Sequence, residues 1–186
     1  MRNLVSAASR SGLGHLVYIS VVGADRIPVV SRMDRAVAAY FAAVRDCEEM
    51  IIASGIPWTI LRASQFFDGF TLVMVRSLAR LPLIPVPAGW RFQPVDTDEV
   101  GARLAELALG PPAGMVPEMA GPRIYTARDV LRSYLRATRR HRLVVTLRVP
   151  GRASRAIRAG ANLAPDHAVG RRTWEEFLAA EVAGSA

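Results

Sequence analysis

His15-Leu-Val-Tyr-Ile-Ser20 and Pro57-Trp-Thr-Ile-Leu-Arg62 are two short apolar runs, rich in β-branched and aromatic residues. Such runs, bounded by glycine or proline, predict buried strands. Between them, apolar residues recur every three or four positions over the segment 31–53, which predicts a long helix that Gly55 ends. Strand, helix and strand in this order form a βαβ unit, and its two strands must lie parallel in one sheet. This unit decides the fold.

The carboxyl ends of the two strands mark the candidate binding site, because ligands of open α/β sheets bind there. One of these ends is Ser20 and the loop after it. The other is the segment Ala63-Ser-Gln-Phe-Phe67. The simplest alternatives are a strand-end serine that bonds backbone and an ordinary loop after a strand.

The rest of the chain continues the alternation of helices and strands. Helical spacing over 66–81 predicts a helix that either roofs a substrate pocket or packs on the body for stability alone. The segment 82–89, with its prolines, predicts an extended loop or edge strand. Further strands are predicted at 115–120 and 143–149, and further helices at 2–11, 96–110, 126–139, 152–161 and from Thr173 onward.

Five segments of this sequence also resemble a known family, the NmrA-like atypical short-chain dehydrogenases/reductases. They are Leu16-Val-Tyr-Ile-Ser-Val-Val-Gly23, Tyr40-Phe-Ala-Ala-Val44, Ser54-Gly-Ile-Pro-Trp-Thr-Ile-Leu-Arg-Ala-Ser-Gln-Phe-Phe67, Phe92-Gln-Pro-Val-Asp-Thr-Asp-Glu-Val100 and Arg171-Arg-Thr-Trp-Glu-Glu-Phe-Leu178. The match covers nearly all of the chain, but only the C-terminal two-thirds of the family's usual length.

The resemblance implies an α/β fold with a partial doubly wound, Rossmann-like parallel sheet. This sheet would lack the N-terminal βαβ part that binds phosphate, and a small C-terminal α+β region would lie on the substrate side. We therefore expect one truncated Rossmann-like domain over residues 1–186. Its core βαβ portion would be 1–68, and 69–186 would hold a lid, the remaining core and the C-terminal elements.

The resemblance also assigns roles to residues. In short-chain reductases a tyrosine gives a proton to the carbonyl oxygen, a serine hydrogen-bonds that oxygen, and a lysine four residues past the tyrosine lowers the tyrosine pKa. The serine corresponds to Ser20, the tyrosine to Tyr40 and the lysine position to Val44. Valine cannot replace the ammonium group, and tyrosine ordinarily has a pKa of about 10. The alternative for Tyr40 is a core residue of an amphipathic helix.

The implied cofactor is NAD(P)H, and the resemblance places its nicotinamide end against Ser20, Tyr40, Ala63, Ser64, Gln65 and Phe66. A Gly-rich phosphate loop follows a strand and opens a helix. Gly12-Leu-Gly14 instead follows a predicted helix and opens a strand, so it is interpreted as a turn. Without the loop, binding of NAD(P)H is expected to be weakened.

Composition excludes several other classes of protein. The net charge is +8, and all 24 basic residues are arginine. Ten of them lie between Arg128 and Arg158 against one acid, Asp129; without a recognisable nucleic-acid fold, a solvated basic face is favoured over nucleic-acid binding. The three histidines, His15, His141 and His167, have no metal-ligand spacing. A single cysteine, Cys47, fits a reducing cytoplasm, and no stretch reaches the ~20 apolar residues of a membrane span.

Two functional hypotheses remain. The first is an NAD(P)H-dependent oxidoreductase of the quinone or carbonyl type, weakly active or inactive because Val44 stands at the lysine position. The second is a non-catalytic NmrA-like regulator that senses a nucleotide or binds a protein partner. In either case, only a partial helix precedes the strand at 15–20, so we expect an open sheet edge with apolar side chains in water and homo-oligomers through that edge.

Overall fold

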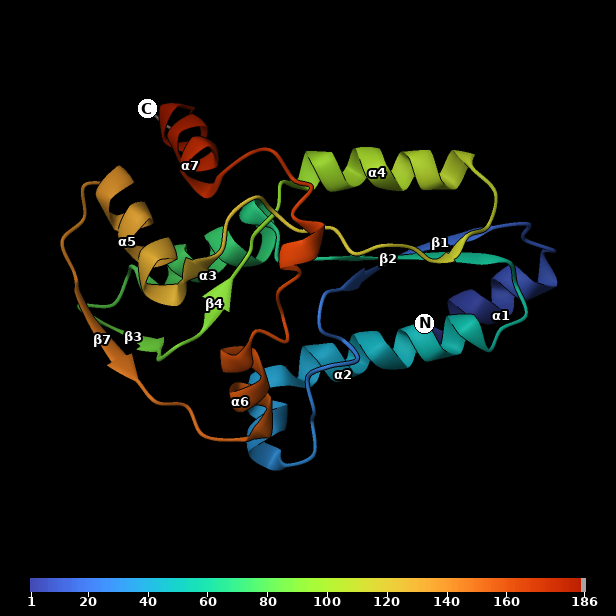
Figure 1. Ribbon diagram of the computed structural model, residues 1–186, viewed down its shortest axis with the longest axis horizontal. Helices are drawn as coiled ribbons and strands as arrows, with labels where there is room; N and C mark the ends of the chain where they lie inside the picture. The colour runs from blue at the N-terminus through green and yellow to red at the C-terminus, as the bar shows by residue number, and fades with distance from the viewer. Residues whose placement is uncertain (185–186) are drawn as a thin grey trace.

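The computed structural model describes residues 1–184, and its centre is the predicted βαβ unit (Figure 1). Strand β1 (Leu16–Val21) and strand β2 (Trp58–Ala63) are parallel neighbours, paired residue by residue along their whole length. Strand β5 (Gly114–Met115) joins the other side of β2, which gives the order β1-β2-β5. The predicted α/β class with a parallel sheet is confirmed.

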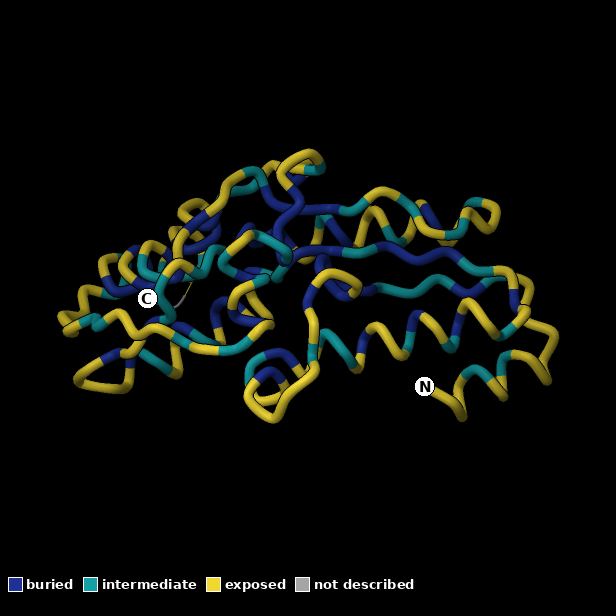
Figure 2. The backbone as a smooth tube through the Cα atoms, turned by 60° about the horizontal axis from the view of Figure 1, so that its bottom comes forward, coloured by how far each residue is buried: buried dark blue, intermediate teal, exposed yellow. Residues whose placement is uncertain are grey.

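Helices cover both faces of this sheet (Figure 1). Helix α1 (Arg2–Arg10) and helix α2 (Arg32–Ile52) lie on one face, and helix α4 (Thr97–Leu109) lies on the other. The most buried segments, dark blue in Figure 2, therefore run through the middle of the molecule between the helices. None of the helices within residues 1–184 is long and apolar enough to cross a bilayer.

The prediction that the side chains of the first strand face water is wrong. Leu16 is buried in a cluster with Ile51 of α2 and Ile60 of β2, and Val17 and Ile19 pack on the α4 side. The physical reason is that α1, α2 and α4 shield both faces of the strand. Only its backbone edge stays open, because β1 pairs with β2 alone among the described strands.

Most of the elements that follow β2, with the exception of α4 and β5, form a second part of the molecule, on the left of Figure 1. Two small sheets lie there, one parallel and one antiparallel, and helices pack around a shared apolar core. The strands are β3 (Leu83–Pro87) with β7 (Leu143–Leu147), and β4 (Arg91–Phe92) with β6 (Tyr125–Thr126). The helices of this core are α3 (Leu72–Leu78), α5 (Ala127–Ala137) and α7 (Trp174–Ala183). Helix α6 (Arg152–Ala159) packs against α2 instead.

Three predicted elements differ in detail from the structure. The single helix expected over 66–81 begins as a π-helical turn, Phe67–Thr71, and continues as α3. The strand expected over 115–120 is reduced to β5 and one isolated bridge between Ala63 and Met119. The extended segment at 82–89 is confirmed as β3, which its prolines tolerate because one edge carries no partner.

Asp34 joins the two halves of the chain. It lies in the first turn of α2, where Ser31 and Asp34 form a capping box. Its carboxylate also accepts the backbone N–H of Ala153 at 2.8 Å, at the start of α6. These backbone and Ser31 hydrogen bonds hold the pKa of Asp34 below its usual range.

Stability should therefore depend on the ionisation of Asp34. A carboxylate whose pKa is lowered by folding stabilises the protein above its unfolded pKa, and this contribution is lost as pH falls through the folded pKa. Chemical unfolding of the wild type between pH 6 and pH 2 should show a loss of stability below about pH 4. The Asp34→Asn variant should be less stable at pH 6 and show a shallower loss. Equal slopes in the two proteins would contradict this role for Asp34.

Candidate functional site

The loops at the carboxyl ends of β1 and β2 form the candidate site. The loop after β1 turns at Gly23, whose φ is +95° and where an added Cβ would lie 2.5 Å from the carbonyl oxygen of Ala161. Glycine is required there because both the backbone conformation and the space exclude a side chain. This close approach brings the segment 161–164 of the second half onto the end of the sheet.

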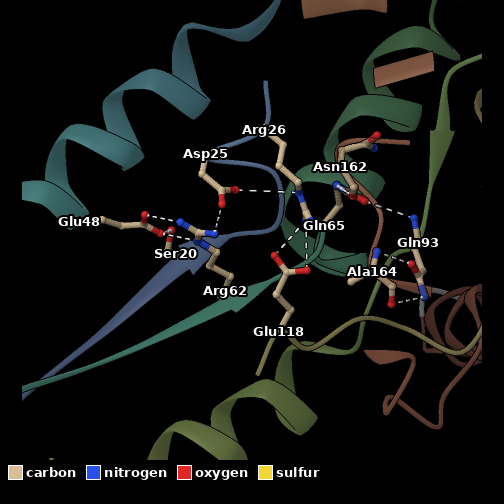
Figure 3. A network of polar contacts seen from close by, with 10 residues as sticks. All are labelled: Ser20, Asp25, Arg26, Glu48, Arg62, Gln65, Gln93, Glu118, Asn162 and Ala164. Carbon is tan, nitrogen blue, oxygen red and sulfur yellow. Dashed lines mark hydrogen bonds and ion pairs between the residues drawn. The ribbon is translucent and has the colours of Figure 1, made fainter. Parts of the chain in front are cut away.

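The Ser20 hydroxyl takes part in a buried ionic network (Figure 3). Its hydroxyl donates a very short hydrogen bond to the carboxylate of Glu48, a residue of α2. Arg62, in β2, binds Glu48 with two parallel hydrogen bonds of 2.8 Å, donated by Nε and Nη2. Its Nη1 reaches Asp25 at 2.8 Å. The Glu48 side chain is 4% exposed and that of Arg62 13%, so this ion pair is enclosed by protein.

Electrostatics follow from this arrangement. The hydrogen bonds that the Arg62 guanidinium donates to Glu48, opposed by burial and supported by Asp25, raise the pKa of Arg62, which is therefore permanently charged. Burial tends to raise the pKa of Asp25, but the hydrogen bond and charge of Arg62 lower it below its usual range. Further out, Arg26 binds both oxygens of Glu118 at 2.9 and 3.1 Å. The network thus fixes the loop after β1 against β2 and the chain beyond β5.

A second network is built from amides, on the other side of the loops in Figure 3. Gln93 is almost fully buried; its Nε2 donates to the carbonyls of Gly121 and Ala164, and its Oε1 accepts the Ala164 N–H at 3.0 Å. Ser64 donates to the Gln93 carbonyl at 2.6 Å. Gln65 accepts the Gln93 N–H and donates to the Asn162 carbonyl across 3.4 Å.

The structure brings some predicted site residues together and separates others. Ala63, Ser64 and Gln65 lie at the carboxyl end of β2, with Ala63 paired to Val21 directly after Ser20. Phe66 follows them, packed against the cluster that faces α4. Ser64, however, is buried and bonded to backbone, which leaves Gln65 as the half-exposed polar side chain of this group.

Tyr40 does not belong to this enclosed network, and it is not a core residue either. Its side chain is 64% exposed on α2, in edge-to-face contact with Phe41 at 6.0 Å. Within residues 1–184 no hydrogen bond or ion pair joins the Tyr40 hydroxyl to a basic side chain. Val44, at the lysine position, is buried beside Val21 and Ala24. No ammonium group stands between the tyrosine and Ser20.

Sequence reasoning missed Glu48, Arg62 and Gln93 as residues of this site. Two of them carry a usable signal. Glu48 falls four residues after Val44 on the apolar stripe of its helix, and Arg62 ends a run that is otherwise apolar. A charge at a buried position needs an opposite charge beside it, so the two residues predict one another. Gln93 gives no such signal, because its partners are backbone groups distant in sequence.

The fold and this edge define a Rossmann-like type of α/β protein. Residues 1–78 match the model of a family described as NAD(P)H-binding. The chain is similar in structure to the NADPH-dependent quinone oxidoreductase QOR2 of Escherichia coli, with a TM-score of 0.74 and 16% identity over 97% of this chain and 70% of that one. No curated protein matches the sequence.

Two further structures share the fold. Triphenylmethane reductase of Citrobacter sp. has a TM-score of 0.68 and 17% identity, over 97% of this chain and 68% of that one. The UDP-glucose 4-epimerase of Thermus thermophilus has a TM-score of 0.63 and 16% identity, over 100% of this chain and 69% of that one. The resemblance to NAD(P)-binding, short-chain reductase-type proteins that the sequence indicates is thereby confirmed.

Proposed function

We propose that this chain is an NAD(P)H-binding domain of the oxidoreductase type in which proton transfer to a substrate is disabled. The observation that supports this proposal is the hydrogen bond that Ser20 donates to Glu48. A serine that orients a carbonyl oxygen must present its hydroxyl to the substrate. Here the residue Ser20 is only 6% exposed. Its hydroxyl already donates to the carboxylate of Glu48, which Arg62 holds in place.

The residues at the sheet edge fit the binding of a nicotinamide, but they do not fit the donation of a proton to a substrate. NAD(P)H, when bound, supplies a hydride to an acceptor. Gln65 would hold the nicotinamide end, because its amide is half-exposed and its 3.4 Å contact to the Asn162 carbonyl is long enough to be exchanged for a ligand. The proton donor is what does not fit, since Tyr40 has no lysine beside it and Val44 is enclosed by apolar side chains.

A second candidate function follows from Tyr40. Exposed aromatic residues are common anchors of protein contacts. A non-catalytic, nucleotide-sensing protein would use the nucleotide to bias such a contact, and the absence of a lysine at position 44 would carry no cost. The two candidates differ in one property, namely hydride transfer.

The full chain should show no NADPH oxidation above the blank with a panel of quinones and aldehydes. The physical reason is that Tyr40 has no lysine to help it donate a proton and that the Ser20 hydroxyl is engaged by Glu48. Absorbance at the nicotinamide band measures turnover, and nicotinamide fluorescence measures binding in the same samples. Gln65→Ala should weaken binding, whereas the exposed Phe70→Ala should not. Turnover that disappears in Tyr40→Phe would contradict the proposal.

We also propose that the chain is one domain and self-associates through the outer edge of β1. That edge carries neither charge nor proline over residues 16–19, and such edges pair readily with other strands. Sedimentation velocity at micromolar concentration should show dimers or larger species. A monomeric wild type would rule the contact out.

A further inference from the structure

The two-stranded sheet formed by β3 and β7 has one protein-covered face and one bare face. Ile84 and Val86 point to the covered face and are buried in the core with α5. Thr146, opposite Val86, is hydrogen-bonded there by Arg128 of α5. Side chains alternate along a strand, so the residues between these positions lie on the other face.

That other face is apolar and exposed. Leu83 and Leu143 are register partners, 50% and 66% exposed, and Leu147 at the far end of β7 is 52% exposed. Pro85 is exposed on the same face. These three leucines therefore lack part of the stabilisation that full burial would give them. An exposed apolar face of this kind marks a docking surface, and the residues around it indicate which kind of partner docks there.

Arginines without counter-charges lie at the end of this sheet where β7 begins, and they form its arginine rim. A cavity of about 910 Å³ lies between the end of α5 and the start of β7, at the end of the molecule where the two meet (Figure 1). Five arginines and one histidine line it, together with three apolar residues and one acid: Arg132, Arg136, Arg139, Arg140, Arg142, His141, Leu135, Leu143, Val144 and Asp129. A neighbouring hollow brings Arg80 to the same Leu143. Arg148 follows Leu147 directly and is exposed.

The charge of these arginines is not balanced within residues 1–184. The one acid of the cavity is Asp129. Its carboxylate accepts a hydrogen bond of 2.6 Å from the Thr126 hydroxyl in the capping box of α5. Arg142 donates only to the carbonyl of His141. No ion pair reaches the other arginines of this cavity in the described part of the chain. The groove therefore presents guanidinium groups to an external anion.

We propose that the bare face of β3–β7 and its arginine rim dock the protein onto an anionic phospholipid surface. Leucines enter the boundary between headgroups and acyl chains, while the arginines bind lipid phosphates. A nucleic acid would use the arginines but leave the leucines in water, and the rim offers no Phe, Tyr or Trp side chain for base stacking. A second copy would bring two like-charged rims together. Only the membrane surface complements both features.

Vesicle co-sedimentation tests the proposal with the full chain. Vesicles of phosphatidylcholine with 30% phosphatidylglycerol should bind the protein, and pure phosphatidylcholine vesicles should not. Arg139→Gln/Arg140→Gln/Arg142→Gln should weaken binding on the order of a hundredfold, since each basic residue at an anionic surface contributes roughly a factor of five. The matched control, Arg2→Gln/Arg32→Gln/Arg35→Gln, removes the same charge from exposed positions elsewhere and should bind nearly as the wild type does.

A third variant separates lipid insertion from anion binding. Leu143→Asn/Leu147→Asn keeps all arginines and should lose binding at 0.5 M NaCl, where apolar contact predominates. Circular dichroism melts confirm that each variant is folded. The proposal is overturned if the control triple variant loses binding equally, if the leucine variant binds like the wild type, or if a single-stranded oligonucleotide or inorganic pyrophosphate displaces the protein from vesicles at micromolar concentration.

Discussion

Arg62→Met should lower the free energy of unfolding by about 3–5 kcal/mol, because it removes one partner of a buried ion pair and leaves the other charged. Glu48 would keep only the Ser20 hydroxyl as a donor, in a site where its side chain is 4% exposed. Most domains are stable by about 5–15 kcal/mol, so this loss is a large share of the total. Urea unfolding followed by far-UV circular dichroism measures it.

The double variant Glu48→Gln/Arg62→Met isolates the cause. It removes both charges, and the glutamine oxygen still accepts the Ser20 hydrogen bond. Most of the lost stability should therefore return, since replacing a whole buried pair by neutral groups is often nearly neutral. Arg45→Met is the surface control: its pair with Glu49 is more than half exposed on both sides and should contribute little. A double variant as unstable as the single one would show that packing of the Arg62 stem, not charge, dominates.

Trp174→Ala should be the most destabilising substitution in the second half of the chain, by about 3–5 kcal/mol. The Trp174 side chain is fully buried, stacked on Phe177 at 5.5 Å and in contact with Phe67 at 5.8 Å. Its indole N–H donates to the Ser133 hydroxyl at 2.9 Å and to the Val130 carbonyl at 3.2 Å. Truncation opens a cavity and also removes the indole donor from the buried Ser133 hydroxyl.

Two variants separate the parts of this loss. Trp174→Phe keeps most of the aromatic packing and should lower stability less than Trp174→Ala does. The loss of stability that Trp174→Phe still shows reflects the indole hydrogen bonds. Phe70→Ala removes an aromatic ring that is 56% exposed and should shift the midpoint little. Thermal and urea unfolding of all three measure the order Phe70→Ala, Trp174→Phe, Trp174→Ala. A loss below 1 kcal/mol for Trp174→Ala would mean that α7 contributes little to the core.

The sequence predicts the local structure of this protein well where local rules decide it. The strands β1 and β2, the helix between them and the caps at Ser31, Asp96, Thr126 and Thr173 all follow from periodicity and capping chemistry. The π-helical turn at Phe67–Thr71 could not be predicted, because the periods of the two helix types hardly differ over five residues.

The candidate site is predicted less completely. The residues at the ends of β1 and β2 follow from the rule for parallel sheets, and the structure places them there. The direction of the Ser20 hydroxyl toward Glu48 depends on a helix 28 residues away in sequence. The exposure of Tyr40 depends on how α2 rotates against the sheet, and α2 departs from helical geometry at Ala38, two residues before the tyrosine. Tertiary packing decides both.

The bond between Asp34 and the backbone of Ala153 spans 119 residues of sequence. A ribosome adds roughly 5–20 residues per second, so α2 waits about 6–24 seconds for the segment that completes its first turn. During that interval the Asp34 carboxylate has only its Ser31 hydrogen bonds, and the side of α2 that packs on α6 faces water or other proteins. The N-terminal half is thus synthesised early but gains its contacts with α6 late. Nascent chains should therefore need protection by a chaperone until α6 has left the exit tunnel.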